Sequence, residues 1–185
     1  MTTKQLKVII KEQVSEQLKL QKYGIKQLKN GLTLNIIKKN FNWLLEAQIK
    51  DAVIGYDKSK EMIIWYDGTW YSGHWEYGLW KNGTWMNGWF KEGIWKNGVW
   101  NTGEWFFGVW ENGLWKSGVW NGGLWKNGVW KDGAFQGGEW RDGIWHNGDW
   151  ISGKWIDGEW KMGKWHYNGE MIKMNRFRGK VPPIN

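Results

Sequence analysis

The sequence predicts an all-β repeat protein: a β-solenoid with a short helical cap at its N-terminus. A Trp recurs at every fifth residue between positions 65 and 165, and a Gly recurs in the same way between positions 68 and 163. The Trp phase is broken where Trp89 precedes Phe90 and where Phe135 replaces a Trp. Self-similarity at a fixed period is the signature of architectures in which each unit buries its apolar side chain by stacking on its neighbours.

The pairing of Gly with Trp supports this interpretation. Residues two apart in an extended chain face the same side, so Gly68 shares a face with Trp70. We interpret the Gly as leaving room for a buried indole. The alternative is an antiparallel β-meander of short hairpins, because the recurring Asn-Gly and Asp-Gly pairs are strong hairpin signals. A meander leaves a wall of Trp in contact with water, so we favour a solenoid that closes around its rings.

A second pattern precedes the Trp tract. Ala-x-Ile recurs at a spacing of five in Ala47-Gln-Ile49 and Ala52-Val-Ile54. It resembles the pentapeptide-repeat family, whose unit is Ala-(Asp/Asn)-Leu-x-x. The resemblance implies a right-handed, four-sided β-solenoid with four units in each coil, in which Gly-x-Trp-x-x takes the place of Ala-x-Leu-x-x.

The composition shifts divide the chain into four segments. At the N-terminus, Leu6, Ile10, Val14 and Leu18 recur at i+4, which predicts an amphipathic helix that covers the open end of the rod or joins copies of the chain. The segments are an N-terminal helical cap at 1–31, the first β-coils and a linker at 32–61, the Trp/Gly solenoid at 62–170, and a C-terminal cap and basic tail at 171–185.

The formal net charge of +8 is unevenly distributed. Residues 1–60 hold 12 Lys and 5 acids, and residues 171–185 hold 4 basic residues and no acid, whereas residues 61–170 hold 10 basic and 13 acidic residues. No stretch approaches the ~20 apolar residues that span a bilayer, and the first residues do not resemble a secretory signal. With the absence of Cys, these features lead us to expect a cytoplasmic or virion protein with no membrane span.

No constellation of residues suggests catalysis. His74, His146 and His166 are too few and too exposed for a metal site, and Gly at a period of five indicates backbone geometry rather than a phosphate-binding loop. We expect no enzymatic activity, no cofactor and no metal. Some twenty Trp in one phase indicate a core, so we do not expect a nucleic-acid partner.

The residue before each Trp points outward and is apolar in the middle of the rod. With four units per coil, these residues form columns such as Trp89, Val109 and Val129. We predict a protein interface at Leu79, Trp89, Ile94, Val99, Val109, Leu114, Val119 and Val129. β-Propensity alone is the alternative explanation of these residues. At the other end, we predict a basic docking tail that extends into solvent and contains Lys173, Arg176, Arg178 and Lys180.

Trp-x-(Asn/Asp)-Gly tracts of this kind resemble those of tailed-phage and other viral proteins. The resemblance implies a non-enzymatic structural or assembly protein, a phage virion or assembly component whose rigid rod is a scaffold for virion subunits or for further copies of the chain. Two alternatives remain. One is an interaction or inhibitor protein that binds a host target such as a topoisomerase or a defence protein. The other is a carbohydrate-binding module that stacks sugar rings on Trp.

Overall fold

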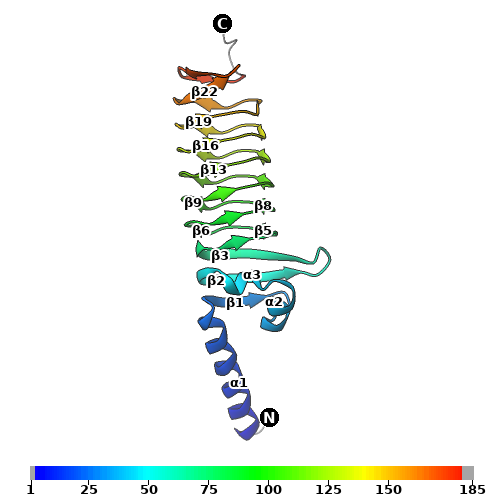
Figure 1. Ribbon diagram of the computed structural model, residues 1–185. Helices are drawn as coiled ribbons and strands as arrows, with labels where there is room; N and C mark the ends of the chain where they lie inside the picture. The colour runs from blue at the N-terminus through cyan, green and yellow to red at the C-terminus, as the bar shows by residue number, and fades with distance from the viewer. Residues whose placement is uncertain (1–2, 181–185) are drawn as a thin grey trace.

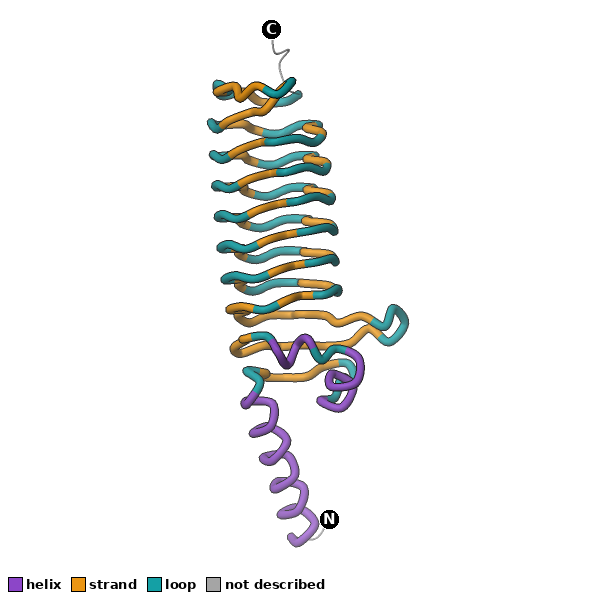
Figure 2. The backbone as a smooth tube through the Cα atoms, viewed as in Figure 1, coloured by secondary structure: helices purple, strands orange, loops and turns teal. Residues whose placement is uncertain are grey.

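The computed structural model describes residues 3–180 and is a β-solenoid of about seven coils. The coils stack into a rod, and α1 (Thr3–Lys22) projects from its N-terminal end (Figures 1 and 2). The predicted β-solenoid with a short N-terminal helix is confirmed.

Each coil contains three units, not four. Strands pair in parallel with the strands fifteen residues away, as Trp105 pairs with Trp120. The four-sided coil was therefore wrong, and so was the antiparallel meander. Three rings already fill the interior, because Trp100 meets Trp95 and Trp105 edge to face with ring centroids 6.0 and 6.2 Å apart. Seven layers at ~4.8 Å give a repeat ~34 Å long.

Most strands of the repeat contain two residues, one outward and one inward, and they form three faces. β3 (Met62–Ser72) contributes to faces 1 and 2. Face 1 continues with β5 (Leu79–Trp80), β8 (Ile94–Trp95), β11 (Val109–Trp110), β14 (Leu124–Trp125), β17 (Glu139–Trp140) and β20 (Lys154–Trp155). Face 2 continues with β6 (Thr84–Trp85), β9 (Val99–Trp100), β12 (Leu114–Trp115), β15 (Val129–Trp130), β18 (Ile144–Trp145) and β21 (Glu159–Trp160). Face 3 consists of β4 (His74–Trp75), β7 (Trp89–Phe90), β10 (Glu104–Trp105), β13 (Val119–Trp120), β16 (Ala134–Phe135), β19 (Asp149–Trp150) and β22 (Lys164–Tyr167).

The inward rings form three buried columns, one behind each face. Within a column the rings lie nearly parallel: Trp100 and Trp115 have centroids 4.7 Å apart and planes 5° apart. Backbone hydrogen bonds join the same layers, since the Val119 N–H donates to the Gly103 carbonyl at 2.9 Å and the Asn121 N–H donates to the Trp105 carbonyl at 2.8 Å. Side chains and backbone therefore repeat at one common spacing.

The Gly residues turn the chain at the corners of each coil. Gly138 has a φ of +105°, in a region that L side chains rarely adopt. A Cβ at this position would lie 2.4 Å from the Gly123 carbonyl oxygen of the preceding coil. The nearest atoms at this corner belong to backbone, so the close approach of the preceding coil is the main reason for Gly. Space for an indole is a second reason at some corners, since a Cβ at Gly78 would lie 2.8 Å from Cζ2 of Trp75.

Within the repeat the Asn-Gly and Asp-Gly pairs lie at these corners and do not form hairpins, whereas Asn168-Gly169, after the repeat, is the turn between the paired residues Tyr167 and Glu170. At several corners the side-chain oxygen accepts a hydrogen bond from the next N–H, as Asn127 Oδ1 does from Gly128 at 2.7 Å and Asp142 Oδ1 does from Gly143 at 2.7 Å. This bond explains the recurrence of Asn and Asp before Gly.

The N-terminal region closes one end of the rod. It continues from α1 through β1 (Ile25–Lys29), α2 (Leu34–Asn40), α3 (Trp43–Glu46) and β2 (Gln48–Asp57). β2 pairs in parallel with β1 and antiparallel with β3, and Trp43 covers the first coil with its ring 5.1 Å from that of Trp75. α3 and the β-strands therefore cover the end of the rod, whereas α1 leaves it.

Two expectations for residues 32–61 were wrong. Residues 34–46 are mainly helical, and α2 begins where the Thr33 hydroxyl accepts a hydrogen bond from the Ile36 N–H at 3.3 Å. The Ala-x-Ile units form no coil of their own, because β2 is one arm of a hairpin with β3. The predicted linker 57–61 forms the turn of this hairpin.

The C-terminal end is closed by a second set of strands. β23 (Glu170–Lys173) forms a hairpin with β22, and β24 (Phe177–Arg178) pairs antiparallel with β21. The Phe177 ring stacks on Trp160 with centroids 5.9 Å apart. Residues up to Lys180 therefore do not extend freely as we expected, and Val181–Asn185 lie outside the described residues.

We predict that Gly138→Ala lowers the unfolding free energy by about 3 kcal/mol or more, because Ala adds both a strained φ and a backbone clash. The neighbouring Gly137 is a matched control, since its φ is not positive and a Cβ there would meet its nearest atom at 3.4 Å. Gly137→Ala should change the stability by less than about 1 kcal/mol. Urea denaturation of both variants measures the difference, and equal midpoints would contradict the backbone role of Gly138.

Candidate interaction surfaces

The eight residues of the predicted interface lie on all three faces rather than in columns four units apart. Face 1 carries Leu79, Ile94 and Val109; face 2 carries Val99, Leu114 and Val129; face 3 carries Trp89 and Val119. The predicted columns were wrong because they rested on four units per coil. The structure joins the residues of each of the first two faces into a continuous aliphatic row.

Exposure separates Trp89 from the other seven residues. The seven aliphatic side chains are half-buried, because equivalent residues in adjacent coils lie beside them. The Trp89 side chain, in contrast, is 46% exposed. It points outward because Phe90 occupies the inward position of β7. That the aliphatic rows bind a protein partner remains a prediction.

Trp89 belongs to an aromatic patch, which we define as Tyr77, Trp89, Phe106 and Phe107. These residues line a hollow of about 690 Å³ together with Glu76, Lys91 and Glu92. The Phe106 ring meets the Trp89 ring edge to face with centroids 6.3 Å apart. Phe107 is 62% exposed, so the patch offers aromatic surface on an otherwise repetitive rod.

Neighbouring coils hold the patch in place. The His74 ring, one coil below, stacks on Trp89 with centroids 4.5 Å apart and planes 4° apart. Phe107 lies against Gly122, where a Cβ would be 3.2 Å from its ring. Our sequence reasoning missed Phe106 and Phe107, although a signal was present: two aromatic residues occupy turn positions that are mostly polar elsewhere in the repeat.

Charged groups border the patch. Lys91 Nζ lies 2.6 Å from Glu76 Oε2, and Glu92 has no ion pair among residues 3–180. The Tyr77 hydroxyl donates to the Glu61 carbonyl at 3.3 Å, and burial raises the pKa of this tyrosine. The hollow therefore combines aromatic carbon with carboxylate and ammonium groups.

Elsewhere on the rod, several charged side chains form ion pairs between coils or within one coil. Glu111 bridges Lys96 at 2.7 Å and Lys126 at 3.5 Å, and the hydrogen bond from Lys96 holds the pKa of Glu111 below its ordinary value. In the predicted basic tail, Arg176 pairs with Glu159 at 2.6 Å. Lys173 and Arg178 lie on the cap strands β23 and β24, and Lys180 follows them with its side chain exposed. The role of these residues as a docking site is still a prediction.

α1 is a second exposed apolar surface. Six of its apolar side chains are exposed, whereas Leu20 near its C-terminal end is buried. The exposed residues are Leu6, Val8, Ile9, Ile10, Val14 and Leu18. Sequence analysis had identified the i+4 stripe, but had not shown that the helix leaves the rod.

Comparison with protein-family models, with curated proteins and with solved structures finds no match for this chain. No cluster of three or more His, Asp or Glu that could hold a metal ion occurs within residues 3–180. Over the same residues, no helix has the length and apolar character needed to cross a membrane.

We predict that Trp89 is the Trp most rapidly oxidised by N-bromosuccinimide. Its side chain is exposed, whereas that of Trp43 is half-buried and the remaining indoles are buried. Trp89→Phe should remove the fast phase of absorbance loss. Trp105→Phe is the control, because this inward position lies in the column that already contains Phe90 and Phe135. A fast phase that survives Trp89→Phe would contradict the exposure described above.

Proposed function

We propose that this chain is a non-enzymatic structural or assembly protein that uses its Trp-cored rod as a scaffold for protein–protein interaction. The observation that carries the proposal is an unbroken aromatic core, closed at both ends, from which α1 extends. A rod in which each coil contacts only its neighbours holds its surface sites at fixed separations. Such a part is suited to spacing and joining other subunits.

The covered ends favour a part of defined length. An open solenoid end presents unpaired strand edges to which further strands add. Here α3 and β2 cover the first coil, and β23 and β24 cover the last. We therefore expect other subunits to bind the sides of the rod and α1, and we do not expect rods to stack end to end.

The resemblance of the Trp/Gly tract to viral repeats extends the proposal to a phage virion or assembly component. We predict that the chain is present in purified phage particles at a fixed ratio to the major structural proteins, as measured by quantitative mass spectrometry. Soluble lysate proteins of similar abundance serve as the carry-over control. If particle purification removed the chain as completely as it removes these control proteins, the chain would not be a virion component.

Saccharide binding is a second candidate function, and the aromatic patch is the observation that favours it. Sugars are amphiphilic, with C–H groups that pack on aromatic rings and hydroxyls that bond carboxylates and ammonium groups. Trp89, Phe106 and Phe107 supply the first kind of surface, and Glu92 and Lys91 supply the second. Pockets of this chemistry, largely apolar with a few polar groups, are typical of small-ligand sites.

We predict that glycans selected on an array lose at least tenfold in affinity with Trp89→Ala, measured by calorimetry, because the ring that carries the stacking surface is removed. Tyr167→Ala is the control, since Tyr167 is also 46% exposed but lies outside the patch. Equal losses in both variants, or no glycan bound by the unmodified chain, would rule out a saccharide site here.

A further inference from the structure

The C-terminal end of the rod is covered on two faces and notched on the third. Above the last full coil, β24 pairs with β21 on face 2, and β23 pairs with β22 on face 3. On face 1, β20 pairs with β17 below it and with no strand above it among residues 3–180. The edge of β20 is therefore recessed between two strands that rise one layer higher.

The notch leaves backbone groups unpaired that the repeat pairs in the coils below. The Trp140 carbonyl accepts a hydrogen bond from the Ile156 N–H at 2.8 Å, and the Gly138 carbonyl accepts one in the same way. The equivalent carbonyls of Gly153 and Trp155 receive no such bond from residues 3–180. Unpaired groups at a strand edge are a template for pairing with another chain. A strand that takes the next place in this ladder would supply two N–H groups, two residues apart.

A hollow of about 770 Å³ lies beside this edge. It forms where the chain leaves the repeat, because Asn168 stands at the position of the next corner Gly and the chain turns back there into β23. Trp155, Trp165 and Tyr167 are among the residues that line it. The two indoles are 8% and 7% exposed, whereas the inward rings of the coils below are almost completely buried. The hollow therefore suits an apolar side chain.

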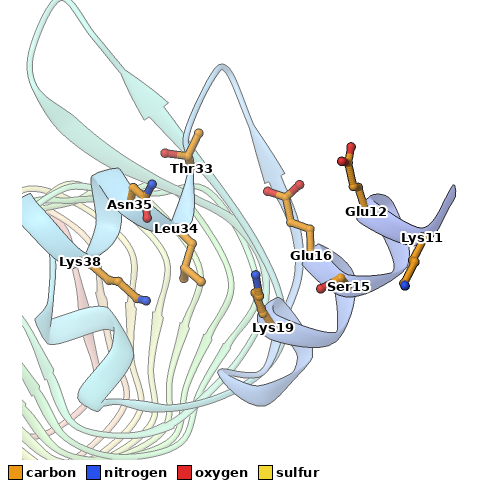
Figure 3. A pocket seen from close by; sticks show the side chains of 9 residues that line it. All are labelled: Lys11, Glu12, Ser15, Glu16, Lys19, Thr33, Leu34, Asn35 and Lys38. Atoms are coloured by element: carbon orange, nitrogen blue, oxygen red, sulfur yellow. The ribbon is translucent and has the colours of Figure 1, made fainter. Parts of the chain in front are cut away.

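The N-terminal end has a hollow of a different kind, between α1 and α2. Figure 3 shows this groove of about 680 Å³ and the charged and hydroxyl side chains that α1 contributes to it. All its lining residues belong to α1, to α2 or to the cap residue Thr33. No strand edge borders this groove, so it offers no ladder of hydrogen bonds to an extended segment.

Neither the chain's own tail nor a second copy fits the notch. The five residues after Lys180 include Pro182 and Pro183, which carry no N–H. As a result, no two of these five residues that lie two apart both have an N–H to donate. In a second rod, β23 and β24 would stand between the two β20 edges, because both strands rise above them. The occupant therefore has to be a single extended segment of another protein.

We infer that the β20 edge is a docking site for an extended segment of a partner protein, which adds to face 1 as one further strand. The main chain of this segment donates to the carbonyls of Gly153 and Trp155, and the apolar side chain between the two donors enters the hollow. In this mode of recognition the main-chain bonds supply affinity and the pocket selects the side chain. The inference specifies one partner of the proposed scaffold and rests on that role.

A labelled peptide tests the inference with the full chain. The probe copies residues 121–126, Asn-Gly-Gly-Leu-Trp-Lys, because this segment lies on face 1 and makes the two bonds in question. The Leu124 N–H donates to the Gly108 carbonyl at 2.9 Å, and the Lys126 N–H donates to the Trp110 carbonyl at 2.8 Å. We expect fluorescence anisotropy to show that the peptide binds. N-methylation at Leu124 and Lys126 of the peptide keeps both side chains and removes both donors, so it should weaken binding at least tenfold. No binding at millimolar peptide, or equal binding of the methylated peptide, would overturn the inference.

A disulfide trap locates the bound peptide, because the chain contains no Cys. Lys154→Cys should cross-link to a peptide that carries Leu124→Cys, since outward residues of paired strands lie opposite each other, as Glu139 and Lys154 do. Lys164→Cys is the matched control. The side chains of Lys154 and Lys164 are 71% and 52% exposed, but the strand of Lys164 is already paired with β23. Equal cross-linking of the two variants would contradict a site at β20.

Two further results would assign the edge to another occupant and so overturn a partner protein. Disulfide dimers that Lys154→Cys forms without peptide, and Lys164→Cys does not form, would indicate a second copy. Peptide binding that appears only after removal of residues 181–185 would indicate the chain's own tail. Absence from phage particles despite peptide binding at this edge would count against the proposed function alone.

Discussion

The structure depends on the match between the spacing of parallel β-strands and the spacing of stacked aromatic rings. Strands in neighbouring layers lie ~4.8 Å apart, and the centroids of Trp110 and Trp125 are 4.9 Å apart with planes 7° from parallel. A ring held in one conformation therefore stacks on its equivalent in the next coil without distorting the backbone. The Phe positions show the constraint, because Phe135 lies 5.8 Å from Trp120 but 4.3 Å from Trp150.

Two of the five positions in each unit are nearly invariant, and a third is Asn or Asp in many units but is Tyr77, Glu92 or Phe107 in others. The indole fills the interior, Gly provides a corner that no L side chain fits, and Asn or Asp before Gly bonds the corner N–H, as Asp157 Oδ1 does with Gly158 at 2.7 Å. Two positions remain free to vary, the outward residues on either side of the Trp. These positions carry the charge pairs and the aliphatic rows.

The period of five in the sequence predicted the inward Trp side chains but not the number of units per coil. A five-residue unit is compatible with three or four sides, and only the contacts between coils distinguish them. The charged side chains did not contain that information: Glu76 pairs with Lys91, and Lys96 pairs with Glu111, each fifteen residues apart. In the sequence, however, Glu76 and Lys96 are opposite charges twenty residues apart, and so are Lys91 and Glu111. These four residues are compatible with either spacing, and the strand pairing between Trp105 and Trp120 is what fixes it at fifteen.

The surfaces were harder to predict because exposure in a solenoid depends on the neighbours above and below. Val109 and Trp89 occupy equivalent positions before an inward ring, yet the first is half-buried and the second is exposed. Likewise, the apolar stripe of α1 fits a cap as well as a free helix until the direction of the helix is known. In both places the informative feature is a departure from the repeat. The repeat makes a straight and regular support, and the residues that break its pattern, such as Phe107 on the rod and Val14 on the helix beyond it, distinguish one part of its surface from another.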